Sequence, residues 1–275
     1  MKHFLATRFN LTVPDWKTSK SGKLVLTDDW LENRFYLFEN YCLPSVKNQT
    51  NQNFIWCVFF DTNTSDFYKN KIKIIEENYS NFKPLFIEGI GSLHNSFKDF
   101  IVNNLRDDEY IITTRLDNDD LIHKDFIKTI QSLYQPIDKT VIDLRKGYSI
   151  TLKKKHSEIR VYVGRFNPFI SLVEEAKKIE TVFAKMHLDW ADSKNIIIED
   201  NLKLWVELVH DENKLNHTKY NLKRALIFNN ADFGLFYDFK LKDPFDKVIS
   251  ANVKLEASSL KQALKYKFKK IFFYG

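Results

Sequence analysis

An acidic cluster follows a β-favouring run in residues 110–120, YIITTRLDNDD. The run leads into Arg115, and the carboxylates of Asp117, Asp119 and Asp120 come within the next five positions. If the backbone stays extended, the side chains of Asp117 and Asp119 point the same way. Paired carboxylates suit Mg²⁺ or Mn²⁺, which take their remaining ligands from substrate phosphates and water. The pattern therefore predicts a site for a divalent cation and a phosphate group.

Two structural interpretations of the same residues stay open. The cluster could close a strand as a solvated acidic turn, and Asp120 is well placed to cap a helix that begins near His123. Carboxylates this close repel each other by about 1 to 4 kcal/mol per pair near a protein surface. A cation or Arg115 must offset that repulsion, and Arg115 could do no more than pair with Asp117.

The elements that must position this cluster alternate between strand and helix. Compact apolar runs predict four strands, at residues 3–10, 53–61, 83–89 and 109–117. Helical patterns separate them, at residues 28–44, 65–79 and 92–105. We expect Asp28 or Asp29 to cap the first helix and Pro44 to stop it. This alternation predicts right-handed crossovers and a parallel sheet.

Parallel sheets bind ligands at the carboxyl ends of their strands. Arg8, Asp61 and Arg115 lie at the ends of three of the predicted strands, and the acidic cluster follows the last of them. We therefore expect these charged groups, which come from separate parts of the sequence, to meet along one edge of the sheet.

The second half of the chain is less regular. We predict a helix at residues 123–134, strands at residues 140–152 and 158–166, and a helix at residues 175–187. Residues 196–213, IIIEDNLKLWVELVHDEN, fit two structures. Glu199 and Asp200 could open an amphipathic helix, or residues 204–210 could form a strand that ends in His210. Periodicity does not separate the two.

Composition excludes several classes of protein. With 275 residues, 44% hydrophobic and 28% charged, the chain is typical of a globular protein. Its two cysteines form no zinc or disulfide pattern. A net charge of +6 is mostly dispersed, so we do not expect nucleic-acid binding. We find no signal peptide and no run near the roughly 18 apolar residues of a membrane span, which predicts a cytoplasmic protein.

The carboxyl-terminal residues 259–275, SLKQALKYKFKKIFFYG, are an exception to the dispersed charge. Leucine, phenylalanine and isoleucine recur there every three or four residues among lysines, as in a basic amphipathic helix. Such a helix can rest on an anionic membrane, here the inner face of the plasma membrane. The alternative is a terminal helix that packs on the domain.

Four sequence blocks carry a resemblance to a known family. They are TRFN (7–10), CLPSVKNQTNQNFIWCVFFD (42–61), TTRLDNDDLIHKDFI (113–127) and NPFISLVEE (167–175). Together they resemble the bacterial rhamnosyltransferase-type family of nucleotide-sugar glycosyltransferases with the GT-A fold, over residues 3 to about 216. The resemblance implies an α/β fold with a Rossmann-like, mostly parallel sheet flanked by helices. It also implies an aspartate-x-aspartate motif after the fourth strand. We expect this domain at residues 1–255 and a basic amphipathic helix at residues 256–275.

The resemblance also implies roles for individual residues. Asp119 would bind Mn²⁺ or Mg²⁺, and Asp117 would contact the donor ribose or share the metal. Arg8 and Asp61 would line the nucleotide-sugar pocket, and Arg115 would neutralise the diphosphate or the acidic cluster. Asp200, with Glu199 behind it, would supply the catalytic base if residues 196–213 are helical. If they form a strand, His210 would complete the metal site.

The implied function is metal-dependent transfer of a sugar from a nucleotide-sugar donor to a bacterial surface-glycan acceptor, in capsule or lipopolysaccharide. Such a hexosyltransferase would use its basic tail to stay near a lipid-linked acceptor. A nucleotidyltransferase is one alternative, although residues 7–16 lack the glycine-rich phosphate loop that we would expect of it. A catalytically inactive GT-A-like binding domain is the other.

Overall fold

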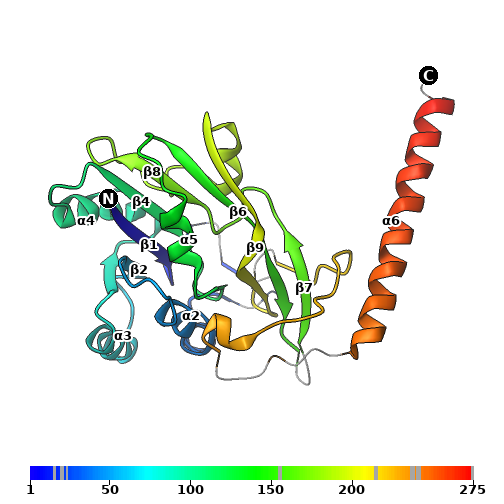
Figure 1. Cartoon of the computed structure of the whole chain (residues 1–275). Helices are drawn as coiled ribbons and strands as arrows, with labels where there is room; N and C mark the ends of the chain where they lie inside the picture. The colour runs from blue at the N-terminus through cyan, green and yellow to red at the C-terminus, as the bar shows by residue number, and fades with distance from the viewer. Residues whose placement is uncertain are drawn as a thin grey trace.

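The computed structural model describes residues 1–14, 17–18, 22, 24–153, 157–213, 216–235, 239 and 243–273, without the side chains of residues 263 and 265–273. Its first half is a parallel sheet in the strand order β3-β2-β1-β4 (Figure 1). The strands are β1 (Lys2–Arg8), β2 (Ile55–Asp61), β3 (Phe82–Ile87) and β4 (Tyr110–Arg115). The four strands expected from the apolar runs are thereby confirmed.

The second half extends the same sheet with mixed pairing. Strand β8 (Ser171–Glu175) runs antiparallel to β4 and joins it to β6 (Thr140–Thr151), which pairs in parallel with β9 (Asn195–Val209). The short β5 (Leu121–Ile122) and the outer β7 (Glu158–Val163) complete it. The acidic cluster thus lies between β4 and β5. The expected α/β fold is confirmed.

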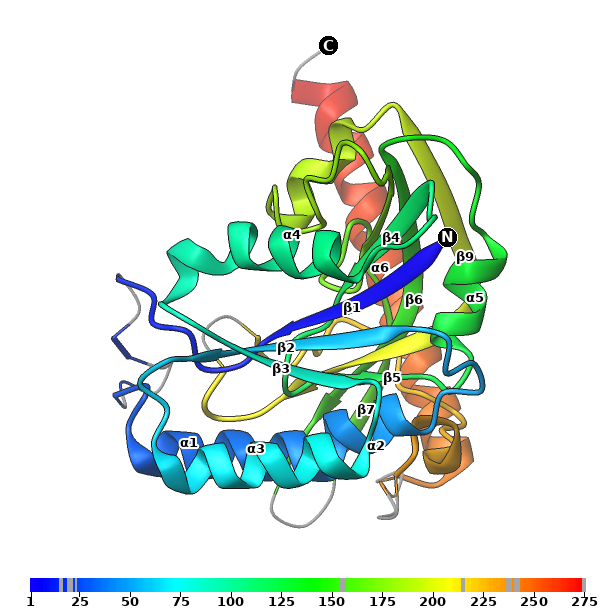
Figure 2. The same ribbon diagram turned by 90° about the vertical axis from the view of Figure 1, so that its left-hand side faces the viewer.

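Helices cover both faces of the parallel half (Figure 2). On one face lie α1 (Asp28–Leu37), α2 (Leu43–Lys47) and α3 (Asp66–Asn78), and on the other lies α4 (Leu93–Asn104). The side chains of β1 alternate accordingly: Leu5 belongs to the core on the α1 face, and Phe4 packs against Phe97 of α4. Burial on both faces explains why β2 is almost continuously apolar.

The first helix differs from the expectation at both ends. Thr27, not Asp28 or Asp29, caps α1, because its side chain accepts a hydrogen bond from the backbone N–H of Trp30. Pro44 does not stop the helical region. A π-helical segment (Phe38–Cys42) shifts the hydrogen-bond register, and Pro44 falls in the first turn of α2, where an N–H is not needed.

The prediction of a helix at residues 175–187 is wrong, and the helix predicted at residues 123–134 is shorter in the structure. The former segment follows β8 as turns, because the buried carboxylate of Glu174 accepts hydrogen bonds from the backbone N–H groups of Glu180 and Thr181, at 2.8 and 2.9 Å. Those bonds fix a loop instead of a helix. Helix α5 occupies only Phe126–Ser132, because residues 121–122 pair as β5 with β9.

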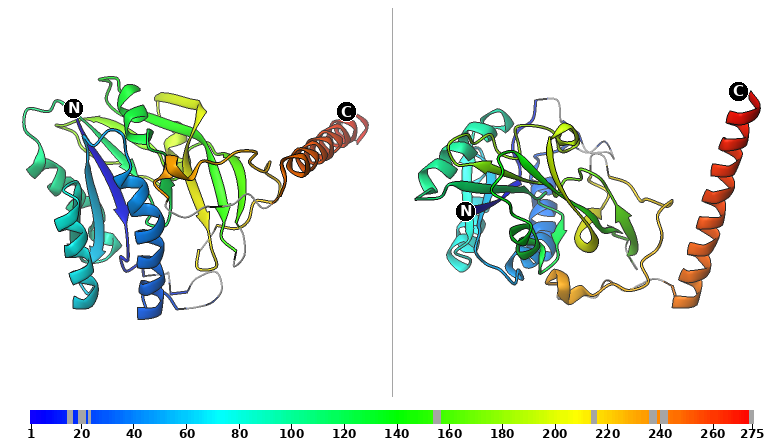
Figure 3. Two further views of the ribbon diagram at one scale, coloured as in Figure 1. Left: turned by 60° about the horizontal axis from the view of Figure 1, so that its bottom comes forward. Right: turned by 45° about the horizontal axis from the view of Figure 1, so that its top comes forward.

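A long carboxyl-terminal helix, α6 (Phe245–Phe273), projects from the rest of the molecule (Figures 1 and 3). It includes residues 256–273 of the expected amphipathic helix, while residues 274–275 lie outside the described residues. Leu260 and Leu264 are exposed, at 65% and 54%. In the described part of the chain, no helix has both the length and the apolar character that a membrane span requires.

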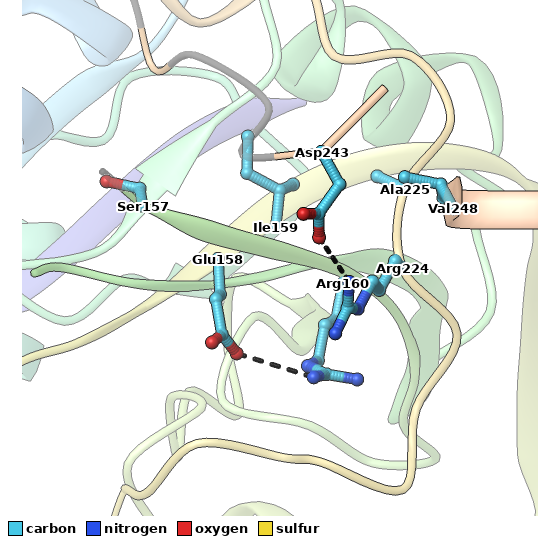
Figure 4. Close-up of a pocket in the computed structure, with 8 residues that line it drawn as sticks. All are labelled: Ser157, Glu158, Ile159, Arg160, Arg224, Ala225, Asp243 and Val248. Atoms are coloured by element: carbon cyan, nitrogen blue, oxygen red, sulfur yellow. Dashed lines mark hydrogen bonds and ion pairs between the residues drawn. The ribbon is translucent and has the colours of Figure 1, made fainter. Parts of the chain in front are cut away.

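The first turns of α6 are tied to residues 223–225. The Asn252 side chain exchanges two hydrogen bonds with the backbone of Arg224. Arg224 also pairs with Asp243 just before the helix, beside a small pocket of about 20 Å³ (Figure 4). Val248 lines that pocket and is 3% exposed. The base of the helix is therefore packed on the domain.

The buried Glu174 predicts a pH dependence of stability. Burial raises the pKa of Glu174 to about 7, against 4.5 for the unfolded group, despite the two backbone hydrogen bonds. The folded protein therefore binds a proton more tightly than the unfolded chain between these values, so the unfolding free energy falls as pH rises from 4.5 through 7. We expect a fall of about 2 to 3 kcal/mol from this group.

The measurement is urea unfolding of the protein and of Glu174→Gln from pH 4.5 to 8. The neutral glutamine should remove most of this group's contribution, so the difference in unfolding free energy between the two proteins should change across that pH range. A difference that stays constant with pH would contradict the expectation.

Candidate active site

Asp119 is the centre of the candidate site. Its Oδ2 atom accepts hydrogen bonds from Arg34 of α1 and from Asn213, at 2.8 and 3.1 Å, and lies 2.8 Å from Nε2 of His210. The Asp119 side chain is 9% exposed. Burial alone would raise its pKa, but Arg34 and His210 lower that pKa well below the usual range. Asp119 is therefore a carboxylate at neutral pH.

Asp117 has different partners. It lies between two arginines, 3.4 Å from Arg8 at the end of β1 and 3.2 Å from Arg115 at the end of β4. Burial acts against ionisation, but the two guanidinium groups lower the pKa of Asp117. Arg8 also lies over the ring of Phe183, 5.8 Å from its centroid. Of the charged groups expected to meet at one edge of the sheet, Arg8, Arg115 and Asp117 are in contact. Asp61 instead bonds Thr12 and Asn63.

Asp120 has a structural role other than the expected one. It does not cap a helix, because β5 follows it directly. Its Oδ1 atom accepts a hydrogen bond from the backbone N–H of Leu208 in β9, at 2.9 Å. Burial, together with the charges of Asp119 and Asp117, raises its pKa well above the usual range. Asp120 thus ties the acidic loop to the strand that leads to His210.

Asp61, at the end of β2, forms one wall of a pocket of about 400 Å³. Its Oδ2 accepts hydrogen bonds from the backbone and side chain of Thr12, and its Oδ1 accepts from the backbone and side chain of Asn63. Burial alone would raise the pKa of Asp61, but these hydrogen bonds lower it below the usual value. Residues 88–91 also line the pocket. With four donors bound, Asp61 shapes this pocket by holding Thr12 and Asn63.

Of the two structures that the sequence of residues 196–213 fits, the protein adopts the strand. β9 runs to Val209, and His210 follows it, so the interpretation with a helix opened by Glu199 and Asp200 is wrong. β6 pairs with β9 from Leu144–Glu199 to Thr151–Val209, with bulges in β9 between them. Seven residues of β6 at about 3.3 Å each place the acidic pair roughly 23 Å from the end of β9 that leads to His210. Glu199 instead accepts hydrogen bonds from the backbone of Asn201 and Leu202. The structure does not bring this acidic pair to the site.

Two site residues have no signal in the sequence. Arg34 comes from the middle of an ordinary helix, 85 residues before Asp119, and it is 5% exposed. Asn213 follows His210 in a turn, where the His210 backbone N–H donates to the Asn213 side chain at 2.7 Å. Neither has a local pattern that distinguishes it, because each gains its role from a contact over a long sequence separation.

The residues present fit a divalent cation held by two protein ligands. Within the described ranges, no group of three or more His, Cys, Asp or Glu side chains could hold a metal ion, so Asp117 does not join Asp119 and His210 in a ready-made cage. Asp119 and His210 do meet, with the 2.8 Å separation that two neighbouring ligands of one ion can have. Such ions commonly bind through few protein groups and take substrate phosphates as further ligands.

The fold is an α/β fold of the GT-A class, and Asp117 and Asp119 follow its fourth strand. The chain belongs to the family described as "Putative rhamnosyl transferase", whose model matches residues 5–221. It is thus a member of a glycosyltransferase family, as the four sequence blocks indicated. Among functionally curated proteins, none matches the chain.

Solved structures give more distant similarities. S. aureus TarS 1-349 in complex with UDP-GlcNAc is 12% identical, with a TM-score of 0.45, over 80% of this chain and 63% of that chain. S. aureus TarS 1-349 gives 12% and 0.43, over 76% and 60%. The 4-diphosphocytidyl-2C-methyl-D-erythritol synthase from Anaerococcus prevotii gives 12% and 0.31, over 93% and 96%. This chain spans less than two thirds of the length of the two TarS chains.

The hydrogen bond from Leu208 to Asp120 predicts how two substitutions at that position differ. Asp120→Asn keeps a side-chain oxygen that accepts from the Leu208 N–H, so we expect an unfolding free energy close to that of the native protein. Asp120→Ala leaves this buried N–H without its partner and should cost about 1 to 3 kcal/mol. Urea unfolding of the three proteins measures this. An asparagine variant as unstable as the alanine variant would contradict the proposed bond.

Proposed function

We propose that this protein is a metal-dependent glycosyltransferase that moves a sugar from a nucleotide-sugar donor to an acceptor. One observation carries the proposal: Asp119 and His210 meet beside the Asp117–arginine cluster, at the sheet edge that also borders the 400 Å³ pocket. A metal-competent pair, two arginines and a pocket at one edge are the parts that a nucleoside diphosphate needs. Membership of the family supports the same activity.

Each part has a distinct role in this proposal. Asp119 and His210 would hold Mn²⁺ or Mg²⁺, which supplies Lewis-acid stabilisation of the charge on a departing diphosphate. Arg8 and Arg115 would bind diphosphate oxygens, because guanidinium groups match the geometry of phosphate. The pocket lined by Asp61, Thr12 and residues 88–91 would hold the nucleoside. Since Glu199 and Asp200 lie far along β9, we do not propose them as the catalytic base.

We further propose a lipid-linked precursor of a bacterial surface glycan, in capsule or lipopolysaccharide, as the acceptor. Support comes from α6, which is tied to the domain at its base and exposes Leu260 and Leu264 beyond it. The same helix carries lysines at positions 261, 265, 267, 269 and 270. A basic helix with exposed apolar residues favours an anionic membrane surface, where such an acceptor is found.

The proposed donor site predicts metal-dependent nucleotide binding. In calorimetric titrations with UDP, GDP, dTDP and CDP, we expect one nucleotide to bind in the presence of Mn²⁺ and at least tenfold more weakly without it. Asp119→Ala should lose the metal-dependent part, because it removes one of the two metal-competent side chains. Asp120→Asn is the matched control and should keep it. If no nucleotide binds with or without Mn²⁺, the proposed function is wrong.

The proposed membrane contact predicts a charge-dependent association. The protein should sediment with phosphatidylglycerol vesicles and not with phosphatidylcholine vesicles. Reversing two charges of α6, in Lys261→Glu/Lys265→Glu, should weaken that association about tenfold or more, since each lysine near such a surface contributes about 1 kcal/mol. Lys73→Glu/Lys128→Glu makes the same charge change on α3 and α5. Equal losses in both variants would attribute the association to net charge and contradict a role for α6.

A further inference from the structure

We propose that Arg34 is a built-in counter-cation of Asp119, which occupies the metal-binding carboxylate in the free protein and so sets the metal affinity of the site. This inference rests on the proposed function, because it assumes that Asp119 binds the metal. It goes further because it gives Arg34 of α1 a role in metal binding, in addition to the roles proposed for Asp119 and His210.

The contacts of Asp119 are the basis for this assignment. Arg34 places Nη1 2.8 Å from Oδ2 of Asp119, the same oxygen that lies 2.8 Å from Nε2 of His210. A divalent cation bound by Asp119 and His210 would therefore approach the oxygen that the guanidinium group already holds. Two cations close together repel strongly where water is excluded, and the Arg34 side chain is only 6% exposed. Metal binding must weaken or displace the contact between Arg34 and Asp119.

The surroundings of Arg34 suit a group that can leave this carboxylate. Besides Asp119, Nη1 donates to the Asn118 side chain at 3.2 Å, and Nη2 reaches the carbonyl of Glu212 at the long distance of 3.5 Å. Within the described residues, the buried Nε atom has no hydrogen-bond partner. The guanidinium lies over the ring of Trp30, 5.0 Å from its centroid. Stacking on this ring gives the cation a position that needs no carboxylate.

The consequence is a coupling between metal and nucleotide. In the free protein, Arg34 competes with the metal for Asp119, so the metal alone binds weakly. A nucleoside diphosphate adds negative charge beside Arg8 and Arg115 and favours a second cation at the site. Metal would therefore bind mainly together with the nucleotide. Without the positive charge of Arg34, the metal affinity of the site should no longer depend on bound nucleotide.

The test is a Mn²⁺ titration without nucleotide, followed through the paramagnetic resonance signal of free Mn²⁺. We expect Arg34→Met to bind Mn²⁺ at least tenfold more tightly than the native protein. Arg34→Lys keeps a cation near Asp119 and should stay close to the native affinity. Asn33→Ala is the matched control on the same helix, because it removes the 2.7 Å bond to Glu212 but leaves Arg34 on Asp119.

The outcomes separate this inference from the proposed function. Mn²⁺ binding to Arg34→Met that equals or falls below native binding, with the variant folded by circular dichroism, overturns the role of Arg34. So does an equal gain in Arg34→Lys or in Asn33→Ala. If Arg34→Met does not fold, Arg34→Gln takes its place under the same criteria. If the native protein binds no nucleotide, with or without Mn²⁺, the proposed function is rejected instead.

Discussion

Repulsion among three carboxylates that follow β4 is the constraint on which this site depends. Each one is accommodated by a different physical means. Asp117 is neutralised by arginines from the ends of β1 and β4, and Asp119 by Arg34 from α1. Asp120 accepts a hydrogen bond from the Leu208 N–H, and its raised pKa favours the neutral acid. Three separate parts of the chain must therefore converge before the motif can be buried, so the site and the fold form together.

The pairing of β5 with β9 brings His210 into the candidate site. Leu121 and Ile122 pair with Val206 and Trp205, and the Leu208 N–H donates to Asp120. These bonds fix the register of β9 against the acidic loop. His210, which follows the strand directly, is thereby delivered to Asp119. A slip of one residue in β9 would turn its side chains to the opposite face and remove the histidine from the site.

The parallel half of the fold was predictable because strands buried on both faces are continuously apolar, as in residues 53–61. The meeting of Arg8, Arg115 and Asp117 followed from the rule that strand ends share an edge. The prediction of a helix at residues 175–187 was wrong because the Glu174 carboxylate accepts two backbone hydrogen bonds that hold this segment as a loop. Arg34 was missed because its only signal is a contact 85 residues away. Local periodicity carries no information on such a pair.

If the acceptor is the proposed lipid-linked glycan, the position of α6 limits how it can reach the site. Asn252 bonds the backbone of Arg224, and Glu256 pairs with Lys223, so these contacts fix the direction in which the helix projects from the domain. The 17 residues from 257 to 273 extend by about 25 Å at 1.5 Å per residue. If this part lies on a membrane, the domain stands at a set orientation to the surface. The acceptor glycan, rather than its lipid, must then extend to Asp119.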